Sequence, residues 1–247
     1  MAIPKSAKIF EARDLNLETR LLTLSMQNKE DLHFMGGQYI IVNTNIPLPG
    51  NKIAKRAYSI LSSDQNQNSF NICVRKIGEG PGSNYMHYAP VGSDIQFSGP
   101  WGQFAPDENS LSCSSALVVA TDTGITAALG LVQGHKFKDH FKECSLIWMR
   151  ESADYFIPED WIKNLLVKDS IDFRSCAIPP VNDMGRLGFG LASLKTALES
   201  RVPDQIFLSG DGALLYPFKE EAKQKGFIDS KIKMECFFNN PFKKIGA

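Results

Sequence analysis

The sequence predicts two domains, an antiparallel β-barrel (residues 1–108) followed by a doubly wound α/β domain with a parallel sheet (residues 109–247). Up to about residue 105, short segments with alternating apolar residues are separated by turn-rich stretches, which is the spacing of an antiparallel barrel or sandwich. From Ala116 onwards, continuous apolar runs alternate with helical patterns, as in a doubly wound sheet. The length of 247 residues suits two modest domains better than one.

The first domain is expected to consist of short strands with an alternating apolar pattern. These strands are the segments 7–15, 19–26, 38–46, 56–61, 69–77 and 93–99. Stretches such as PLPGN and SSDQNQNS separate them and are rich in residues that favour turns. A glycine-rich turn at 80–82 precedes a short helix through His87, and Ser83 is expected to be the N-cap of that helix. The polar stretch 105–112 is expected to be a linker.

Strands and helices alternate in the second domain. Strands are expected at 116–120, 144–150, 172–175 and 205–209, and helices at 127–134, 158–167, 190–200 and 214–226. A continuous apolar run such as 116–120 is typical of a parallel strand that is covered on both faces. The turn 121–126 after this strand is the expected place for dinucleotide phosphates, because ligands of such folds bind at the carboxyl ends of the strands.

The bulk composition excludes several classes of partner. The chain carries 27 basic and 27 acidic side chains, so no global field favours nucleic acid or an anionic membrane surface. The N-terminal segment lacks the apolar core of a signal peptide, and no apolar run approaches the length that crosses a bilayer. We therefore expect a cytoplasmic monomer or weak dimer without nucleic-acid or membrane partners.

The spacing of cysteines and histidines predicts no metal site. The five cysteines are Cys73, Cys113, Cys144, Cys176 and Cys236. They contain no CxxC pair, and their odd number and wide scatter favour free thiols in a reducing compartment. The four histidines form no ligand motif either, and His135 and His140 are expected to be exposed helix residues.

The segment Arg56-Ala57-Tyr58-Ser59 is the first candidate for a binding site. Side chains alternate along a strand, so Arg56 and Tyr58 face the same way and present a cation beside a flat ring, which suits a phosphate and a planar ligand. The alternative is an edge strand with a solvated arginine. The turn that contains Gly80 and Gly82 leads into a helix start, where free amide groups favour an anion, although an ordinary capped turn would have the same sequence.

Together, RxYS and GxxSNY resemble the flavin-binding half of the ferredoxin–NADP reductase family. By this resemblance Arg56 holds the FAD pyrophosphate, Tyr58 lies on the isoalloxazine and Ser59 lies near its N5. The further FAD-binding residues that the resemblance implies are Ala57, Gly80, Gly82 and Ser83. The segments GGQYIIV and GPWGQF also resemble family elements, and Trp101 and Phe104 would either cover the cofactor or pack in the core.

The segment ATDTGITA resembles the family's ATGTGIAP, in which the turn binds the dinucleotide phosphates. The resemblance implies that Thr121, Thr123 and Gly124 bind NADPH, while Asp122 replaces a glycine and Ala127 a proline. A carboxylate beside a pyrophosphate repels it unless the side chain turns away or caps the following helix. We expect capping, which leaves the phosphate site usable.

Arg150, Arg174 and Arg186 are expected to converge on one rim of the parallel sheet, with Arg150 and Arg174 at strand ends. Planar guanidinium groups bind phosphates, and the resemblance assigns such arginines to the 2′-phosphate of NADPH. Arg186 matches the family's GR element, whereas Arg174-Ser175 inverts the usual Ser-Arg order. For each arginine taken singly, a solvated side chain is the alternative.

The segment SGDGAL resembles the family's CGPxxM element, which faces the nicotinamide. Gly210 and Asp211 are therefore predicted to bind the cofactor, with Ser209 in the position of the family's cysteine and Asp211 in that of its proline. In the terminal strand, Glu235 with Phe237 or Phe238 fits the family's closing element, whose ring shields the flavin and must move before hydride passes.

The resemblance implies a flavoprotein reductase that moves electrons from NADPH through FAD to ferredoxin, flavodoxin or the ferredoxin component of an oxygenase. Ser59, Ser209 and Glu235 are the predicted catalytic residues, and no metal is expected. FAD is favoured over FMN because two separate phosphate-binding elements suggest a pyrophosphate. One alternative is an NADH-dependent oxygenase, flavin or ferric reductase. The other is a flavin-binding electron-transfer subunit that no longer uses nicotinamide, suggested by Asp122 and Ser209.

Overall fold

The computed structural model describes residues 4–27, 30–107, 114–169 and 171–242. These residues fall into two compact units. The first unit extends to Ala105 and also includes Leu129–Phe137, and the second unit contains the remaining residues. The predicted domain boundary between residues 108 and 109 lies outside the described residues and stays a prediction.

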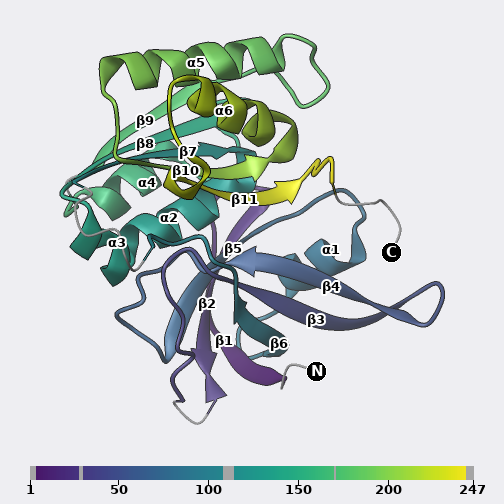
Figure 1. Ribbon diagram of the computed structural model, residues 1–247. Helices are drawn as coiled ribbons and strands as arrows, with labels where there is room; N and C mark the ends of the chain where they lie inside the picture. Colours follow the sequence, from purple (N-terminus) through teal and green to yellow (C-terminus); the bar gives the residue numbers. More distant parts are fainter. Residues whose placement is uncertain (1–3, 28–29, 108–113, 170, 243–247) are drawn as a thin grey trace. The chain divides into compact units, whose positions relative to one another are not determined.

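An antiparallel sheet forms the first unit, with the strand order β4-β3-β6-β1-β2-β5 among the described residues (Figure 1). Its elements are β1 (Lys5–Asp14), β2 (Thr19–Met26), β3 (Tyr39–Leu48), β4 (Lys52–Ser59), β5 (Ser69–Arg75), α1 (Pro81–Tyr88) and β6 (Asp94–Trp101). An antiparallel bridge between Ile60, just after β4, and Ile72 of β5 joins the two edges of the sheet. The Leu61 N–H also donates to the Asn71 carbonyl over 2.9 Å. The sheet thus closes into the predicted barrel.

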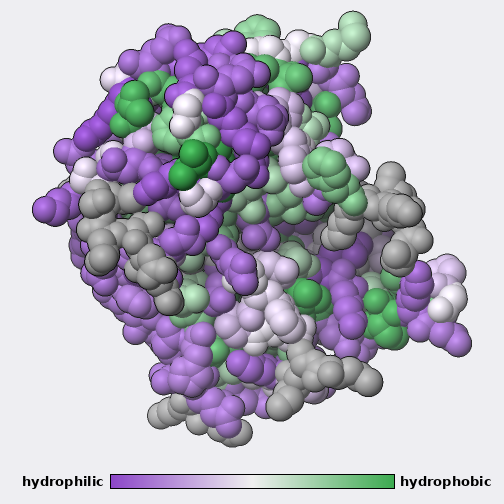
Figure 2. All heavy atoms as spheres, viewed as in Figure 1, coloured by the Kyte–Doolittle hydropathy of each residue, from purple (hydrophilic) through white to green (hydrophobic). Residues whose placement is uncertain are grey.

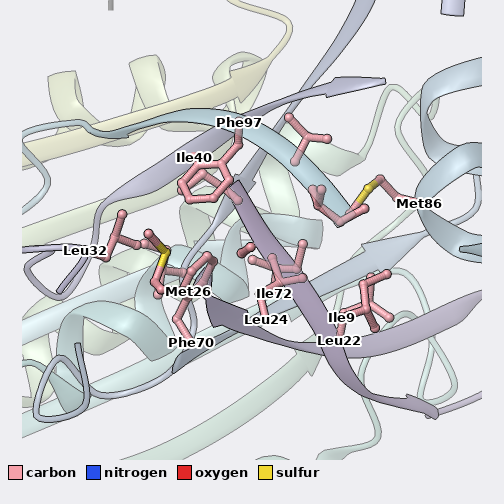
Figure 3. Close-up of a cluster of buried hydrophobic side chains, with 14 of the residues drawn as sticks. Ile9, Leu22, Leu24, Met26, Leu32, Ile40, Phe70, Ile72, Met86 and Phe97 are labelled. Carbon is pink, nitrogen blue, oxygen red and sulfur yellow. The ribbon is translucent and has the colours of Figure 1, made fainter. Parts of the chain in front are cut away.

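The barrel core follows from the alternating apolar pattern of the strands. Leu22, Leu24 and Met26 of β2 are buried because alternate residues of a strand share a face. Phe70 of β5 and Phe97 of β6 lie in the same cluster, with ring centroids 5.9 Å apart in an edge-on arrangement (Figure 3). This packed interior fixes the position of β4, which carries Arg56 and Tyr58 of the candidate flavin site.

A parallel sheet forms the second unit, with the strand order β11-β10-β7-β8-β9 in the described part of the chain. Its strands are β7 (Ser115–Thr121), β8 (Glu143–Arg150), β9 (Ile171–Ala177), β10 (Gln205–Asp211) and β11 (Ile232–Phe238). Its helices are α4 (Glu159–Leu166), α5 (Arg186–Ser200) and α6 (Gly212–Gln224), whereas α2 (Ile125–Gln133) and α3 (His135–His140) contain residues of both units. Helices α5 and α6 cover one face of the sheet and α4 lies on the other, which confirms the doubly wound fold (Figure 1).

The strand order of the second unit locates its binding crevice. β7 and β10 are adjacent and are buried along their whole length. The chain passes from β7 to β8 on one side, while β10 lies on the other side, so the order of the strands changes direction between β7 and β10. In doubly wound sheets, ligands bind at such a switch point, beyond the carboxyl ends of the strands. Here these ends are Thr121 and Asp211.

The starts of α1 and α5 differ most from those that the sequence indicated. Helix α1 begins at Pro81 with Gly80 as its N-cap, so the expectation that Ser83 caps it is wrong. Proline suits the first helical position, because its ring fixes φ and its missing N–H has no partner there. The Ser83 hydroxyl instead donates to the Gly80 carbonyl over 3.0 Å. Helix α5 begins at Arg186 rather than Gly190.

Polar and charged residues dominate the face in Figure 2, and apolar residues appear there in small groups. In the described residues, no helix has the length and apolar character needed to cross a membrane. The same residues contain no group of three or more His, Cys, Asp or Glu side chains that could hold a metal ion. Cys73, Cys144 and Cys176 are free thiols, and burial raises the pKa of each. Cys113 lies outside the described residues.

Candidate functional site

The first unit brings Arg56 of β4 against the start of α1. A Cβ atom at Gly82 would lie 2.7 Å from the Arg56 Cγ and 3.1 Å from its Nε, so the arginine crosses the helix where glycine leaves room for it. Gly80 and Ser83 flank this contact as N-cap and first-turn residue. The predicted phosphate-binding residues of the two motifs are therefore neighbours in space.

The charge of this cluster suits an anion. The first turn of α1 contains no acidic residue, and the Gly80 N-cap provides no side-chain hydrogen bond to the helix amides. The Arg56 side chain is exposed and donates to the carbonyl of Lys55 over 2.8 Å. Among the described residues, Arg56 has no ion pair with a carboxylate. A guanidinium beside a helix start, with its charge available, is a favourable site for a phosphate.

Tyr58 and Ser59 complete the β4 segment. Tyr58 lies opposite Ile40 of β3 and packs against the barrel core. Its hydroxyl is buried and has no hydrogen-bond partner in the described structure, and burial raises its pKa. A buried hydroxyl without a partner is costly, so a bound ligand that accepted a hydrogen bond from it would stabilise the site. Ser59 is buried opposite Tyr39, and Ala57 is exposed opposite Ile41.

Trp101 and Phe104 differ in exposure. Trp101 is 39% exposed and donates its indole N–H to the Ser98 hydroxyl over 3.2 Å. Phe104 is only 2% exposed. Core packing, one of the two roles expected from the sequence, is therefore the role of Phe104.

In the second unit, the turn after β7 packs tightly against the end of β10. The Ser209 hydroxyl donates to the Gly124 carbonyl over 3.0 Å, and the Asp211 N–H donates to the Thr121 hydroxyl over 2.8 Å. A Cβ atom at Gly124 would lie 2.3 Å from the Ser209 carbonyl oxygen, so only glycine fits there. The predicted Thr121, Gly124, Ser209 and Asp211 are thus brought together at the switch point. Gly210 lies between the last two and shares this contact.

The expectation that Asp122 caps the following helix is wrong. Its carboxylate forms a buried ion pair with Arg186, whose guanidinium also lies 3.5 Å from the Asp211 carboxylate. All three side chains are at most 4% exposed. The reason is geometric: an N-cap residue has an extended backbone, whereas Asp122 has a left-handed φ of +53°. This Asp122–Arg186–Asp211 triad has two carboxylates for one guanidinium.

Burial raises the pKa of Asp122 to about 6, and the guanidinium of Arg186 opposes this shift. Asp211 has additional partners, because its carboxylate accepts from the Ala213 N–H and the Asn239 amide, each over 3.0 Å. Asp211 is thereby the N-cap of α6. The Trp148 indole N–H donates to the Asp122 carbonyl over 2.8 Å and ties the turn to β8.

The three predicted phosphate-binding arginines do not converge, and each has an internal partner. Arg186 belongs to the triad and also donates to the Pro179 carbonyl over 2.6 Å. Arg150, at the end of β8, is 5% exposed and contacts the Glu159 carboxylate and the Ser175 hydroxyl. Neither guanidinium is exposed to a ligand.

Arg174 is not at a strand end, as the sequence had indicated, but in the middle of β9. It is exposed and pairs with Asp172 over 2.7 Å. With Ser115 and Glu143, the first residues of β7 and β8, it lines a cavity of about 420 Å³. This is the amino end of the sheet, opposite the switch point.

Glu235 lies on β11 directly beside Ser209 of β10. Two of the three predicted catalytic residues are thus neighbours, while Ser59 belongs to the first unit. Burial raises the pKa of the Glu235 carboxyl. Phe237 is exposed and Phe238 is half-buried beside Asp211. The flavin-shielding role of these rings stays a prediction.

The sequence did not single out Glu159 or Trp148, and it drew attention to Ser175 only for its order relative to Arg174. Glu159 begins α4 and has the pattern of an ordinary acidic residue in a first helical turn. Its link to Arg150 and Ser175 depends on how α4 packs on the sheet, which no local pattern encodes.

A comparison with protein families identifies the first unit. Residues 6–105 match the family described as the oxidoreductase FAD-binding domain. The barrel is an FAD-binding domain. Arg56, Gly82 and Tyr58, the candidate phosphate- and ring-binding residues, all lie inside the matched range.

Curated relatives agree with this assignment. Ferredoxin–NADP reductase B of Sorangium cellulosum is 36% identical over 125 residues, which is 51% of this chain and 49% of that protein. NADH-cytochrome b5 reductase 1 of Dictyostelium discoideum is 26% identical over 134 residues, 53% of this chain and 45% of that protein. The aligned part therefore spans about half the length of these relatives.

Solved structures share the fold of the whole chain. A ferredoxin NADP+ reductase from Neisseria gonorrhoeae with bound FAD and NADP aligns with a TM-score of 0.75 at 18% identity, covering 96% of this chain and 100% of that one. Phthalate dioxygenase reductase aligns with a TM-score of 0.70 at 17% identity, covering 94% of this chain and 67% of that one. The resemblance to the ferredoxin–NADP reductase family seen in the motifs is confirmed.

Proposed function

We propose that this chain is a flavoprotein reductase that moves electrons between a reduced nicotinamide dinucleotide and a one-electron carrier through FAD. The observation that carries the proposal is the Arg56–Gly82 contact within the FAD-binding domain. FAD supplies the chemistry, since it accepts two electrons from a nicotinamide and releases them singly. The chain supplies the binding site.

The residues of the first unit fit such a cofactor. Arg56 and the amides of Gly82 and Ser83 would hold its pyrophosphate, because they combine a guanidinium charge with a helix start. The Tyr58 ring and its unpartnered hydroxyl would contact the flavin nucleotide. Two phosphate-binding elements favour FAD over FMN.

The donor and acceptor are proposed from the relatives. The names of the curated relatives contain NADP in one case and NADH in the other, so either dinucleotide is a candidate donor. NADPH was favoured in the sequence by three converging arginines, an arrangement that the structure does not show. Ferredoxin, flavodoxin or the ferredoxin component of an oxygenase is the proposed acceptor.

The proposal is tested by mixing the FAD-loaded protein anaerobically with NADPH and, separately, with NADH in a stopped-flow instrument. We expect the oxidised flavin band to bleach with at least one dinucleotide, and reoxidation by added ferredoxin or flavodoxin. A protein that holds FAD but is bleached by neither dinucleotide would contradict the reductase.

One observation favours a second function, a flavin-binding electron-transfer subunit that does not use nicotinamide. The triad places a buried carboxylate in the turn where dinucleotide phosphates would bind, and the Ser209 hydroxyl is fully buried and donates to Gly124. In that case chemically reduced flavin would still pass electrons to a carrier, whereas neither NADPH nor NADH would bind.

A further inference from the structure

Glu159 occupies the group of donors that a phosphate at the end of β8 would use. Its carboxylate contacts both the Arg150 guanidinium and the Ser175 hydroxyl. Arg150 ends β8, and Ser175 lies on the neighbouring β9, with its side chain on the same face of the sheet as Trp148 and Arg150. A buried guanidinium with an adjacent hydroxyl is a donor set that suits a phosphate.

This cluster lies where doubly wound folds usually contact the adenosine ribose of a bound dinucleotide. In such folds the first strand and its glycine turn bind the pyrophosphate, and the end of the next strand contacts the ribose 2′ position. Here β7 with Gly124 is the first strand and β8, which ends at Arg150, is the next. An arginine there would accommodate a 2′-phosphate if its guanidinium were available.

Arg150 is not available. Its side chain is 6% exposed, stacks over the Trp148 ring at 4.7 Å and also donates to the Ala153 carbonyl over 2.6 Å. Glu159, which is 28% exposed, pairs with this buried guanidinium. Lys163 holds the other carboxylate oxygen of Glu159 over 2.6 Å. The hydrogen bonds from Lys163 and Ser175 lower the pKa of Glu159, so the carboxylate is charged at neutral pH.

No other predicted arginine replaces it. Arg186 is held by Asp122 inside the triad, and Arg174 lies toward the amino end of the sheet. A 2′-phosphate arriving at β8 would therefore meet the Glu159 carboxylate, and like charges repel.

We propose that Glu159 is a specificity-determining residue that makes the second unit select a nicotinamide dinucleotide with a free ribose 2′-hydroxyl, NADH, over NADPH. This inference rests on the proposed reductase function. It assigns Glu159 the role of an internal anion that occupies Arg150 and Ser175 in place of the 2′-phosphate.

The test is calorimetric titration of the FAD-loaded protein with NAD+ and NADP+, which measures binding without electron transfer. We expect the unmodified protein to bind NAD+ about tenfold more tightly than NADP+ or better. Glu159→Gln removes the charge while it keeps the side-chain size, and should tighten NADP+ about tenfold while NAD+ changes less than about twofold. 2′,5′-ADP, which carries the 2′-phosphate without nicotinamide, should gain affinity in parallel.

Two variants control this experiment. Asp172→Asn removes the carboxylate partner of exposed Arg174 on β9 and should leave the NAD+ to NADP+ ratio unchanged. Glu159→Asp keeps the charge and should retain the preference for NAD+. The ratio in the unmodified protein tests the direction of the preference even if a variant fails to fold.

Three results would overturn the inference. A preference of the unmodified protein for NADP+, or a ratio that Glu159→Gln leaves unchanged, would overturn it while the reductase function stands. The absence of binding of either dinucleotide to any of the proteins would overturn both and favour the electron-transfer subunit.

Discussion

The start of α1 and the turn after β7 are both glycine-containing turns that lead into a helix, yet their charges are arranged in opposite ways. At α1, Arg56 is exposed and its guanidinium has a backbone carbonyl as partner. After β7, Asp122 and Arg186 are buried and paired with one another. One turn presents a cation outward, and the other encloses its charges within the fold.

The difference shows what a glycine turn does and does not determine. Glycine allows a ligand or a side chain to approach the backbone, as Gly82 does for Arg56. Whether a phosphate binds there depends on the cation, and a guanidinium that already has a carboxylate partner contributes little to an anion site. In the second unit, the arginines that the sequence assigned to phosphate binding are instead paired with carboxylates of the protein itself.

The largest effect is expected from the substitution Arg186→Ala. It leaves the Asp122 and Asp211 carboxylates buried without their shared cation, and breaking a buried pair costs about 3–5 kcal/mol. Urea denaturation should show this loss in the free energy of unfolding. Arg174→Ala, whose ion pair with Asp172 is exposed, is the matched control and should change stability by less than about 0.5 kcal/mol. Equal effects of the two substitutions would remove the distinction between enclosed and exposed arginines.

The next test is Arg56→Ala in the first unit. Because Arg56 is exposed, the free energy of unfolding of the FAD-free protein should remain nearly unchanged. The affinity for FAD should fall by roughly 10- to 100-fold, the effect of losing hydrogen bonds to a charged phosphate. Quenching of FAD fluorescence measures this affinity. Lys55→Ala, on the adjacent exposed position of β4, is the control, and an equal loss with it would point to general charge rather than the Arg56 contact.

The smallest expected effect concerns pH. Burial raises the pKa of Asp122 from 3.8 to about 6, so the folded protein binds a proton that the unfolded chain releases. The stability that this group contributes is greatest below about pH 4 and falls as the pH rises through 6. Relative to Asp122→Asn, which cannot titrate and tolerates a positive φ, the protein should lose about 1 kcal/mol between pH 5 and pH 7.

Parallel urea denaturations of the two proteins at these pH values measure the difference. If the free energy of unfolding of the unmodified protein minus that of Asp122→Asn stayed constant or rose with pH, Arg186 rather than burial would control the ionisation of Asp122.

The fold could be predicted from the sequence because the pattern of apolar residues within each segment indicates how that segment is buried. The alternating pattern of β2 and the continuous apolar run of β7 each report the burial of their own strand. The contact between Arg56 and Gly82 was also predictable, since the two residues belong to two short motifs that the sequence grouped into one candidate site. The same local reading placed Arg174 at a strand end, because the polar residues within β9 hide how far the strand extends.

The contacts of the candidate nucleotide site were less predictable because they join distant parts of the chain. Asp122 meets Arg186 across 64 positions and Asp211 meets Arg186 across 25, and only the folded sheet brings them together. Glu159 and Ser175 are 16 positions apart on a helix and a strand. An arginine in a sequence shows that a cation exists, but not which carboxylate will neutralise it.

The fluorescence of Trp148 depends on these contacts. Its indole is fully buried, donates to the carbonyl of Asp122 and lies under the guanidinium of Arg150. This side chain thus touches both the turn after β7 and Arg150, whereas Trp101 in the other unit and Trp161 of α4 are partly exposed. Its fluorescence should be emitted at short wavelength, and a change in colour or intensity would report any rearrangement of these charges without an added label.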